Sequence, residues 1–441
     1  MPLLPAEFVA TLKPLFGDEW AQFEAALNEA PITSIRWNDK TDLPIDGDRV
    51  PWCPQGRYLS ERPNFTRDPW FHAGAYYVQE ASSMFLQYVV NQFVVFNAVV
   101  LDMCAAPGGK STLLSQHVSH GGLLVANEFV RQRAHILSEN LQKWGNSNVI
   151  VTNNAPSDFA TFAGTFDAVL VDAPCSGEGM FRKDDTAVAE WSPANVHHCV
   201  ERQRDILQAA WHCLKTNGIL IYSTCTYNPF ENEENVRWLC NRFGAELLRL
   251  PIDPAWQITE TAEGYHFYPH KTRGEGLFIS VLRKLDAEPS AKIHNKTQYR
   301  KLADSQFVNY LNDSDLYANV EHLGKHYAFA WSHTDLLQIC LKQLHVLHFG
   351  VALAEQKGRD FLPQPSLALS KALNAEAFNR VEVDLETALR YLRCEAIFLP
   401  DAPKGFLLVT YRQVPLGWVK NIGNRCNNLY PAAWRIRMNL T

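Results

Sequence analysis

Several features that would narrow the class of this protein are missing from its sequence. The ten cysteines include no Cys-x-x-Cys pair, which argues against a structural zinc site. No apolar run is long enough to span a bilayer, and the N-terminus lacks the basic start and apolar core of a signal peptide. Internal repeats and low-complexity blocks are also absent. We therefore expect a metal-free protein of the cytoplasm.

The composition is that of a folded protein, with 46% hydrophobic and 20% charged residues in a chain of 441. This length predicts two or three domains. A net charge of −6 argues, taken alone, against binding nucleic acid. The segment from Ala402 to Thr441 is different, because it has no Asp or Glu. Its basic residues are Lys404, Arg412, Lys420, Arg425, Arg435 and Arg437. They form either a phosphate-binding patch or an ordinary solvated surface.

Turn residues and hydrophobic periodicity divide the chain into four parts. These are an N-terminal extension (1–95), an α/β core (96–285), a polar linker (286–300) and a C-terminal region (301–441). In the extension we predict helices over Ala6–Phe16, Glu19–Leu27 and Glu80–Phe96. In the C-terminal region, β-branched and aromatic runs such as His345–Phe349 and Phe406–Tyr411 predict a small β-rich module.

The core alternates predicted strands and helices in the manner of a doubly wound sheet. The predicted strands are Val99–Met103, Leu123–Asn127, Val149–Thr152, Ala168–Val171, Ile219–Tyr222, Tyr265–Tyr268 and Leu277–Leu282. Helices fit between them at Lys110–His117, Val130–Trp144 and Asn195–Leu214. This order resembles the class I S-adenosylmethionine-dependent methyltransferase fold, in which the last two strands form an antiparallel hairpin.

A glycine-rich turn joins the first predicted strand to the following helix. In Cys104–Lys110, consecutive glycines let backbone amides approach a ligand at the positive end of that helix. The same turn is also explained by backbone needs alone. Glu128 ends the second predicted strand and Asp172 ends the fourth, close to the same crevice. Together they favour a nucleoside ligand, because an acid at a strand end can accept hydrogen bonds from both ribose hydroxyls. Asn153 and Asn154 end the third strand and offer amides to an adenine edge.

Two cysteines follow strands in turns where a thiol is reachable. Cys175 lies in Asp172-Ala-Pro-Cys-Ser-Gly, and Cys225 lies in Ser223-Thr-Cys-Thr. A thiolate that adds to carbon 6 of a cytosine makes carbon 5 nucleophilic, and this opens a covalent route to methylation. Each turn alone is equally compatible with a structural role. Both thiols downstream of a glycine loop favour the catalytic interpretation.

Three segments together resemble the Sun-type RNA cytosine-C5 methyltransferases. They are Cys104–Lys110, Asp172–Gly179, and Ser223–Tyr227 followed by Asn228–Asn235. The resemblance implies that Cys225 is the nucleophile, that Cys175 assists release of the product, and that Asp172 faces the methyl group and the base. It further implies S-adenosylmethionine bound by a set of residues: Cys104, Ala105, Ala106, Pro107, Gly108, Gly109, Lys110, Glu128, Arg133, Asn154 and Asp172. The family usually has an acid where Asn154 stands.

Softer signals resemble the bacterial RsmF-like branch of this family. They are Gly56–Leu59, His72–Met84 and Trp418–Tyr430. This resemblance implies small-subunit rRNA as substrate, free or within the ribosomal subunit, an RNA-binding N-terminal extension and a PUA-like C-terminal region. We expect a monomer.

Further residues are candidates for contact with RNA. Arg182 and Lys183 follow the Cys175 loop, and Trp52, Trp70 and Trp191 offer stacking surfaces for unpaired bases. For any single tryptophan, burial in a core is the alternative.

Other functions stay open at this point. One is a non-catalytic RNA-binding factor for ribosome assembly, and another is a methyltransferase acting on tRNA. A third is a DNA cytosine methyltransferase, in which the Pro-Cys thiol, here Cys175, would attack the base.

Overall fold

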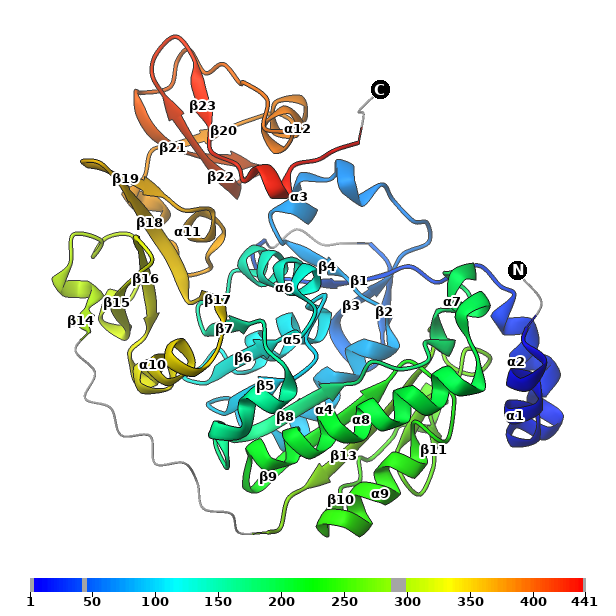
Figure 1. The fold of residues 1–441 in the computed structure, drawn as a ribbon. Helices are drawn as coiled ribbons and strands as arrows, with labels where there is room; N and C mark the ends of the chain where they lie inside the picture. Colours follow the sequence, from blue (N-terminus) through cyan, green and yellow to red (C-terminus); the bar gives the residue numbers. More distant parts are fainter. Residues whose placement is uncertain (1–3, 42–45, 287–298, 439–441) are drawn as a thin grey trace.

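A ten-stranded mixed β-sheet forms the centre of the molecule in the computed structural model, which describes residues 4–41, 46–286 and 299–438 (Figure 1). The strand order is β11-β12-β13-β9-β8-β5-β6-β7-β17, and β10 pairs with β13. The strands from β7 to β9 in this order run parallel, whereas β13 and β12 are antiparallel. This is the predicted doubly wound α/β fold with its terminal antiparallel hairpin.

The predicted core strands are confirmed, with shifts of a few residues at their ends. Their bounds are β5 Val99–Asp102, β6 Leu123–Asn127, β7 Val149–Thr152, β8 Phe166–Asp172, β9 Leu214–Thr224, β12 Tyr265–Phe267 and β13 Leu277–Arg283. The short strands β10 (Glu246–Leu247) and β11 (Thr259–Glu260) complete this side of the sheet. Because both faces of the sheet are covered, the central strands are mostly apolar, with polar residues concentrated at their ends.

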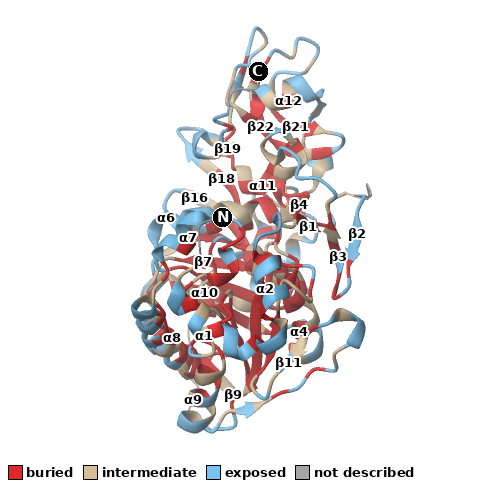
Figure 2. Cartoon of the chain, turned by 90° about the vertical axis from the view of Figure 1, so that its right-hand side faces the viewer, coloured by how far each residue is buried: buried red, intermediate tan, exposed pale blue. Residues whose placement is uncertain are grey.

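Helices cover the two faces of the sheet and enclose two apolar cores. On one face lie α4 (Leu86–Phe93), α5 (Gly109–His117) and α6 (Arg131–Trp144). On the other lie α8 (Pro193–Cys213) and α9 (Glu233–Phe243). Figure 2 shows the buried strands of the sheet between helices whose outer faces, as on α8 and α9, are exposed. Among the described residues, no helix has the length and apolar character needed to cross a membrane.

The predicted helix over Glu80–Phe96 is too long. Its first part is a 3₁₀ turn, Ser82–Phe85, and regular helix is confined to α4. The Glu80 carboxylate accepts hydrogen bonds from the backbone N–H groups of Ser82 and Ser83, so this residue caps the turn from outside it.

The N-terminal module consists of two helices and a small sheet. Helices α1 (Ala6–Phe16) and α2 (Trp20–Leu27) match their predictions closely, and they lie on the opposite side of the catalytic domain from the C-terminal sheets (Figure 1). The sheet has the order β2-β3-β1-β4. Its strands are β1 Ser34–Trp37, β2 Asp48–Val50, β3 Cys53–Tyr58 and β4 Tyr76–Val78, and α3 (Pro69–His72) precedes β4.

The C-terminal region is more divided than the single module that we predicted. A five-stranded sheet contains β14 Arg300–Lys301, β15 Tyr317–His322, β16 Lys325–Ala330, β18 Val351–Lys357 and β19 Asp360–Pro363. A separate four-stranded sheet contains β20 Arg380–Glu382, β21 Gly405–Tyr411, β22 Val414–Asn421 and β23 Cys426–Asn428. Helices α10 (Thr334–Gln343), α11 (Pro365–Leu369) and α12 (Leu385–Leu392) accompany them. Most of the predicted linker, residues 287–298, lies outside the described residues.

One strand of the C-terminal region belongs to the central ten-stranded sheet. Strand β17 (Val346–Phe349), which lies in the predicted run His345–Phe349, pairs antiparallel with β7. It covers an edge of the sheet that would otherwise expose unpaired backbone groups. The run predicted a strand correctly, but its composition does not specify the sheet that it joins.

Candidate active site

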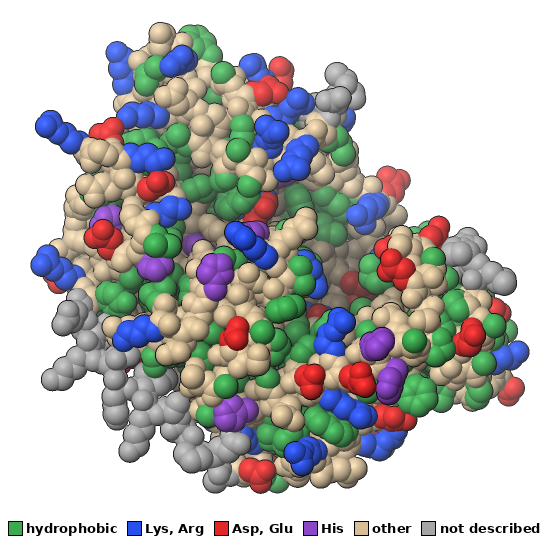
Figure 3. All heavy atoms as spheres, in the orientation of Figure 1, with side chains coloured by type: hydrophobic (Ala, Val, Ile, Leu, Met, Phe, Trp, Pro, Cys, Tyr) green, Lys and Arg blue, Asp and Glu red, His purple; other side chains and the backbone are tan. Residues whose placement is uncertain are grey.

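The carboxyl ends of β5, β6, β8 and β9 bring the predicted site residues to one edge of the sheet. They border a cleft of about 1570 Å³. The predicted residues that line it are Cys104, Ala106, Pro107, Lys110, Glu128, Arg133, Asp172, Cys175 and Cys225. Figure 3 shows a hollow near the middle of one face of the molecule, with Lys and Arg side chains around it. In an open α/β sheet this edge is the usual position of a ligand.

The glycine-rich turn is built to bring backbone close to the cleft. Gly108 has φ +117°, a conformation that side chains disfavour, and it caps the N-terminus of α5. The Ala105 N–H donates to the Asn127 carbonyl over 2.8 Å, and the Arg133 guanidinium donates to the Ala106 carbonyl over 2.8 Å. The turn is therefore fixed to β6 and α6. Ala105, Gly108 and Gly109 shape the turn without lining the cleft themselves.

Glu128 offers an acceptor to the same cleft. Its side chain is only 5% exposed and accepts a hydrogen bond from the Val130 N–H over 2.8 Å. Arg133 lies 3.7 Å from its other oxygen. A buried carboxylate at the end of the second parallel strand suits the hydroxyl groups of a ribose.

The amides predicted to read an adenine are engaged within the protein. The Asn154 side chain donates to Asp158 over 3.0 Å and accepts from the His345 N–H over 2.9 Å. The Asn153 amide donates to the carbonyls of Glu128 and Phe129. Neither residue lines the cleft, which is bordered here by the next segment, residues 155–157. Asn154 instead connects the end of β7 to the chain entering β17.

Lys110 and Asp172 form an ion pair inside the cleft, 2.8 Å apart. The Ser223 hydroxyl donates to the same Asp172 oxygen over 2.7 Å. Burial favours a neutral amine, but the adjacent carboxylate outweighs it, so the pKa of Lys110 is raised. Asp172 thus joins the glycine loop to the strand that carries Cys225.

The two predicted thiols meet in the cleft, with 3.2 Å between Sγ of Cys175 and Sγ of Cys225. The hydrogen bond from Cys175 lowers the pKa of Cys225, and the charge of Lys110 acts in the same direction. The same hydrogen bond, together with burial, raises the pKa of Cys175. Cys225 is therefore the thiol that ionises first, with Cys175 as its hydrogen-bond donor.

Two buried glutamates that our sequence analysis did not assign hold the thiol loops together. Glu178, on the Cys175 loop, accepts hydrogen bonds from the Tyr227 N–H over 2.9 Å, the Trp191 indole over 2.9 Å and the Asn228 amide over 3.3 Å. Glu231 on the other loop accepts from the Ser176 N–H over 3.0 Å. Glu178 lies in the segment Asp172–Gly179 and Glu231 in Asn228–Asn235, so their position within these motifs could have marked them as functional.

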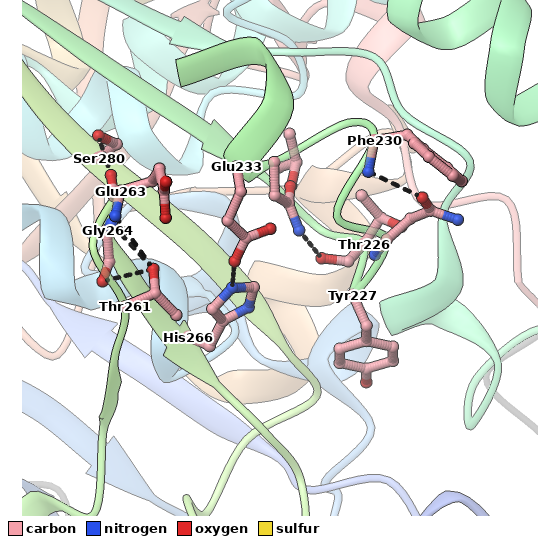
Figure 4. Close-up of polar contacts among 12 residues, drawn as sticks. Thr226, Tyr227, Phe230, Glu233, Thr261, Glu263, Gly264, His266 and Ser280 are labelled. Atoms are coloured by element: carbon pink, nitrogen blue, oxygen red, sulfur yellow. Dashed lines mark hydrogen bonds and ion pairs between the residues drawn. The ribbon is translucent and has the colours of Figure 1, made fainter. Parts of the chain in front are cut away.

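The segment after Cys225 is further held to the neighbouring strands. Figure 4 shows Glu233 at the start of α9 facing His266 of β12, and their Oε1 and Nε2 atoms are 2.5 Å apart. In the preceding turn, the Phe230 N–H donates to the Asn228 side chain over 3.1 Å. These contacts set the position of the loop independently of any ligand.

Several predicted RNA contacts are wrong because the side chains are buried. The Arg182 side chain is 1% exposed and donates to the carbonyls of Gly274 and Ala30. Trp52 and Trp191 are 4% and 6% exposed and lie in apolar cores. This confirms the alternative stated for single tryptophans, which was burial in a core. Trp70 is partly buried, with Arg412 above its ring. The described residues contain no group of three His, Cys, Asp or Glu side chains able to hold a metal.

Comparison with known proteins agrees with this arrangement. The family model described as 16S rRNA methyltransferase RsmB/F matches residues 94–283. Models described as the N-terminal domain of 16S rRNA methyltransferase RsmF and as the methyltransferase RsmF PUA domain match residues 4–81 and 378–436. The PUA match thus covers the four-stranded sheet and excludes the five-stranded one before it.

Relatives of similar length carry related names. The ribosomal RNA small subunit methyltransferase F of Erwinia tasmaniensis is 32% identical over 407 residues, which cover 87% of this chain and 84% of the relative. The protein of that name from Escherichia coli is 32% identical over 412 residues, with 87% and 83% coverage.

Solved structures support the fold. A methyltransferase homolog from Pyrococcus horikoshii has a TM-score of 0.56 and 27% identity, covering 63% of this chain and 95% of its own. NSun6 from the same organism, solved with SFG, has a TM-score of 0.54 at 22% identity and covers 64% and 98%.

The strand order and the cleft at its carboxyl edge define a class I S-adenosylmethionine-dependent methyltransferase. Within that class, the chain belongs to the 16S rRNA methyltransferase RsmB/F family. The predicted fold, family and enzyme class are confirmed, and the DNA-modifying and non-catalytic alternatives lose their support.

Proposed function

We propose that this protein methylates carbon 5 of a cytosine in small-subunit rRNA, with Cys225 forming a covalent adduct at carbon 6. The observation that carries the proposal is the thiol pair in the cleft, with 3.2 Å between the two sulfur atoms. The lowered pKa of Cys225 and the raised pKa of Cys175 favour Cys225 as the thiolate. The addition requires a thiolate, which Cys225 provides. A second thiol beside it is placed to assist the later elimination.

The steps balance with these two residues. The Cys225 thiolate adds to carbon 6 of the cytosine, and the electron pair of the ring double bond moves toward carbon 5. Bound S-adenosylmethionine would supply an electrophilic methyl group there, and its sulfur would keep the electron pair of the broken bond and leave as S-adenosylhomocysteine. Removal of the carbon 5 proton restores the double bond and expels the Cys225 thiolate. In this proposal Cys175 first loses its own proton to solvent. Its thiolate then assists removal of the carbon 5 proton, and so the release of the product.

The residues that line the cleft fit the cofactor. The glycine turn of Cys104–Lys110 brings backbone to it, Glu128 accepts from the ribose hydroxyls, and Asp172 faces the transferred methyl group. Arg133 holds both the turn and Glu128. Asn154 does not contact the cofactor in this proposal. Its side chain bonds Asp158 and the His345 N–H, and so holds the backbone beside the cofactor site.

The surrounding domains provide the RNA contacts in this account. Residues 1–95 and the C-terminal sheets bind rRNA around a catalytic domain of 96–285, and the basic residues after Ala402 contact phosphates. All ten cysteines are free thiols, as a reducing cytoplasm would keep them. We propose that the protein works there as a monomer, on the free rRNA or on the small subunit.

Methyl transfer from labelled cofactor to 16S rRNA and to assembled small subunits tests the proposal. Cys225→Ala should abolish incorporation, whereas Cys240→Ala, a thiol in α9 outside the cleft, should leave it unchanged. Full turnover by Cys225→Ala would refute the assignment of the nucleophile. Incorporation into DNA but not RNA by the wild type would refute the substrate.

A further inference from the structure

A second cavity, of about 600 Å³, lies where the N-terminal module meets helix α6. It shares no lining residue with the catalytic cleft. Its walls come from the segment between β3 and α3, from α3 and β4, and from the last two turns of α6. Its size falls in the range of pockets that enclose small ligands.

One wall of this cavity, which we call the junction pocket, is a group of aromatic rings. The ring centroids of Phe65, Phe71 and Tyr76 lie 6.1 to 6.2 Å from one another. Phe65 and Phe71 are only partly buried, so their rings are accessible from the cavity. Aromatic rings in an open pocket are the common means of holding an unpaired base by stacking.

Polar groups suited to the edge of a base also line the pocket. Trp144 is 1% exposed and lines the pocket, and its indole N–H has no acceptor among the described residues. Asn140 and Tyr77 also line it, with the Asn140 amide 3.4 Å from the Tyr77 hydroxyl. Asn140 and Tyr77 are only partly buried, so their amide and hydroxyl groups can bond a ligand with ring nitrogens or carbonyl groups.

Charge around the pocket favours a polyanion. Arg62 is exposed on its rim, with its guanidinium 5.6 Å from the Phe65 ring centroid. Lys143 lines the pocket as well and is paired with Glu139 over 2.6 Å. Among the described residues that line the pocket, Arg62 is the cation outside an ion pair, and it is placed to meet a phosphate beside a stacked base.

The junction pocket is joined to the cofactor loop by one hydrogen bond. The Asn140 amide donates to the carbonyl of Pro107 over 2.8 Å, and Pro107 lines the catalytic cleft. Tyr77 lies on the other side of the same loop, 3.3 Å from the position of a β-carbon at Gly109. The junction pocket therefore lies beside the loop that borders the cleft, which places a base held there close to the target site.

We propose that the junction pocket binds a second unpaired base of the RNA strand whose target cytosine enters the catalytic cleft. The inference rests on the proposed function for the identity of the strand. The base stacks on Phe65 and Phe71, its polar edge meets Asn140 and Tyr77, and Arg62 contacts the adjoining phosphate. The pocket holds the strand while the target base leaves its stack.

The test compares the double variant Phe65→Ala/Phe71→Ala with the wild type on a 16S rRNA transcript containing 4-thiouridine. The variant should raise the KM for RNA about tenfold, the loss expected from one stacked base, with kcat and the KM for cofactor little changed. The control is Phe96→Ala, an exposed ring that lines neither cavity. A second variant, Thr66→Tyr, fills the pocket without removing a ring and should act in the same direction.

Photocrosslinking on the same transcript separates this inference from the proposed function. Crosslinks should fall on the peptide that contains Phe65 and Tyr77, and both pocket variants should lose them while crosslinks to the catalytic cleft persist. An unchanged KM in both variants would overturn the inference, even if methylation proceeds. If the wild type methylates no RNA, the proposed function fails, and persistence of the pocket crosslinks in both variants would then overturn the inference.

Discussion

Glu178 offers the sharpest test of how the two thiol loops are held. This carboxylate is fully buried and accepts three hydrogen bonds, two of which come from the loop that carries Cys225. Glu178→Ala leaves three buried donors without an acceptor. Each costs about 1–3 kcal/mol when unsatisfied, and water entering the vacated space recovers part of the sum. We expect the free energy of unfolding of the catalytic domain to fall by about 3–5 kcal/mol.

The conservative variant Glu178→Gln sets a finer scale. It keeps one acceptor oxygen but turns an amide N–H₂ toward a donor, so the expected loss is about 1–3 kcal/mol. The matched control is Glu190→Ala, an exposed glutamate on the neighbouring helix α7 (Asp185–Glu190), which should change stability by less than about 0.5 kcal/mol.

Urea unfolding followed by tryptophan fluorescence measures these losses, because the Trp191 indole is itself a donor to Glu178. Methyl transfer below the unfolding transition should also fall in Glu178→Ala, since the Cys225 loop loses its attachment. If Glu178→Ala stays within about 1 kcal/mol of the wild type, the carboxylate does not hold the loops and this reasoning fails.

Three further predictions concern charges around the site. Burial raises the pKa of Glu231 from 4.5 to about 7, so stability should fall by up to about 3 kcal/mol as pH rises through this window, and Glu231→Gln should flatten that slope in unfolding measured against pH. Lys110→Met removes a charge that helps to lower the pKa of Cys225, so the acid limb of the pH–rate profile should move to higher pH by about one unit. If the KM for cofactor rises and the profile does not move, Lys110 acts only in cofactor binding. Arg182→Met should destabilise the fold by about 3–5 kcal/mol, because it removes the buried partner of Glu275 and the donor to the carbonyls of Gly274 and Ala30, without weakening RNA binding in a filter assay. A selective loss of RNA affinity would restore the phosphate contact that its burial excludes.

The parts of the site that local sequence determines were predictable. Apolar runs identified the parallel strands, and residues that follow such strands collect at one sheet edge whatever the rest of the chain does. The turn of Cys104–Lys110 and the thiols of Cys175 and Cys225 belong to this group. Their spacing from the strand ends was enough to bring them into one cleft.

The errors arise where burial depends on distant packing. Arg182 and Trp191 are covered by contacts with the N-terminal helices and adjoining residues, so neither faces solvent. Likewise, Asn154 is taken up by His345, almost two hundred residues away in the sequence, because β17 joins the sheet. Glu178 and Glu231 were visible in the motifs, but only the folded loops show which donors they meet.

The central claim is the covalent role of Cys225, and one measurement tests it most directly. Purified Cys175→Ala is incubated with 16S rRNA and S-adenosylmethionine beside Cys175→Ala/Cys225→Ala, and both are run on a denaturing gel. The account predicts a slow-migrating protein–RNA band in the single variant alone, because the adduct forms through Cys225 and its release is impaired. A band of equal intensity in the double variant, or no band in either while the wild type methylates the RNA, would contradict it.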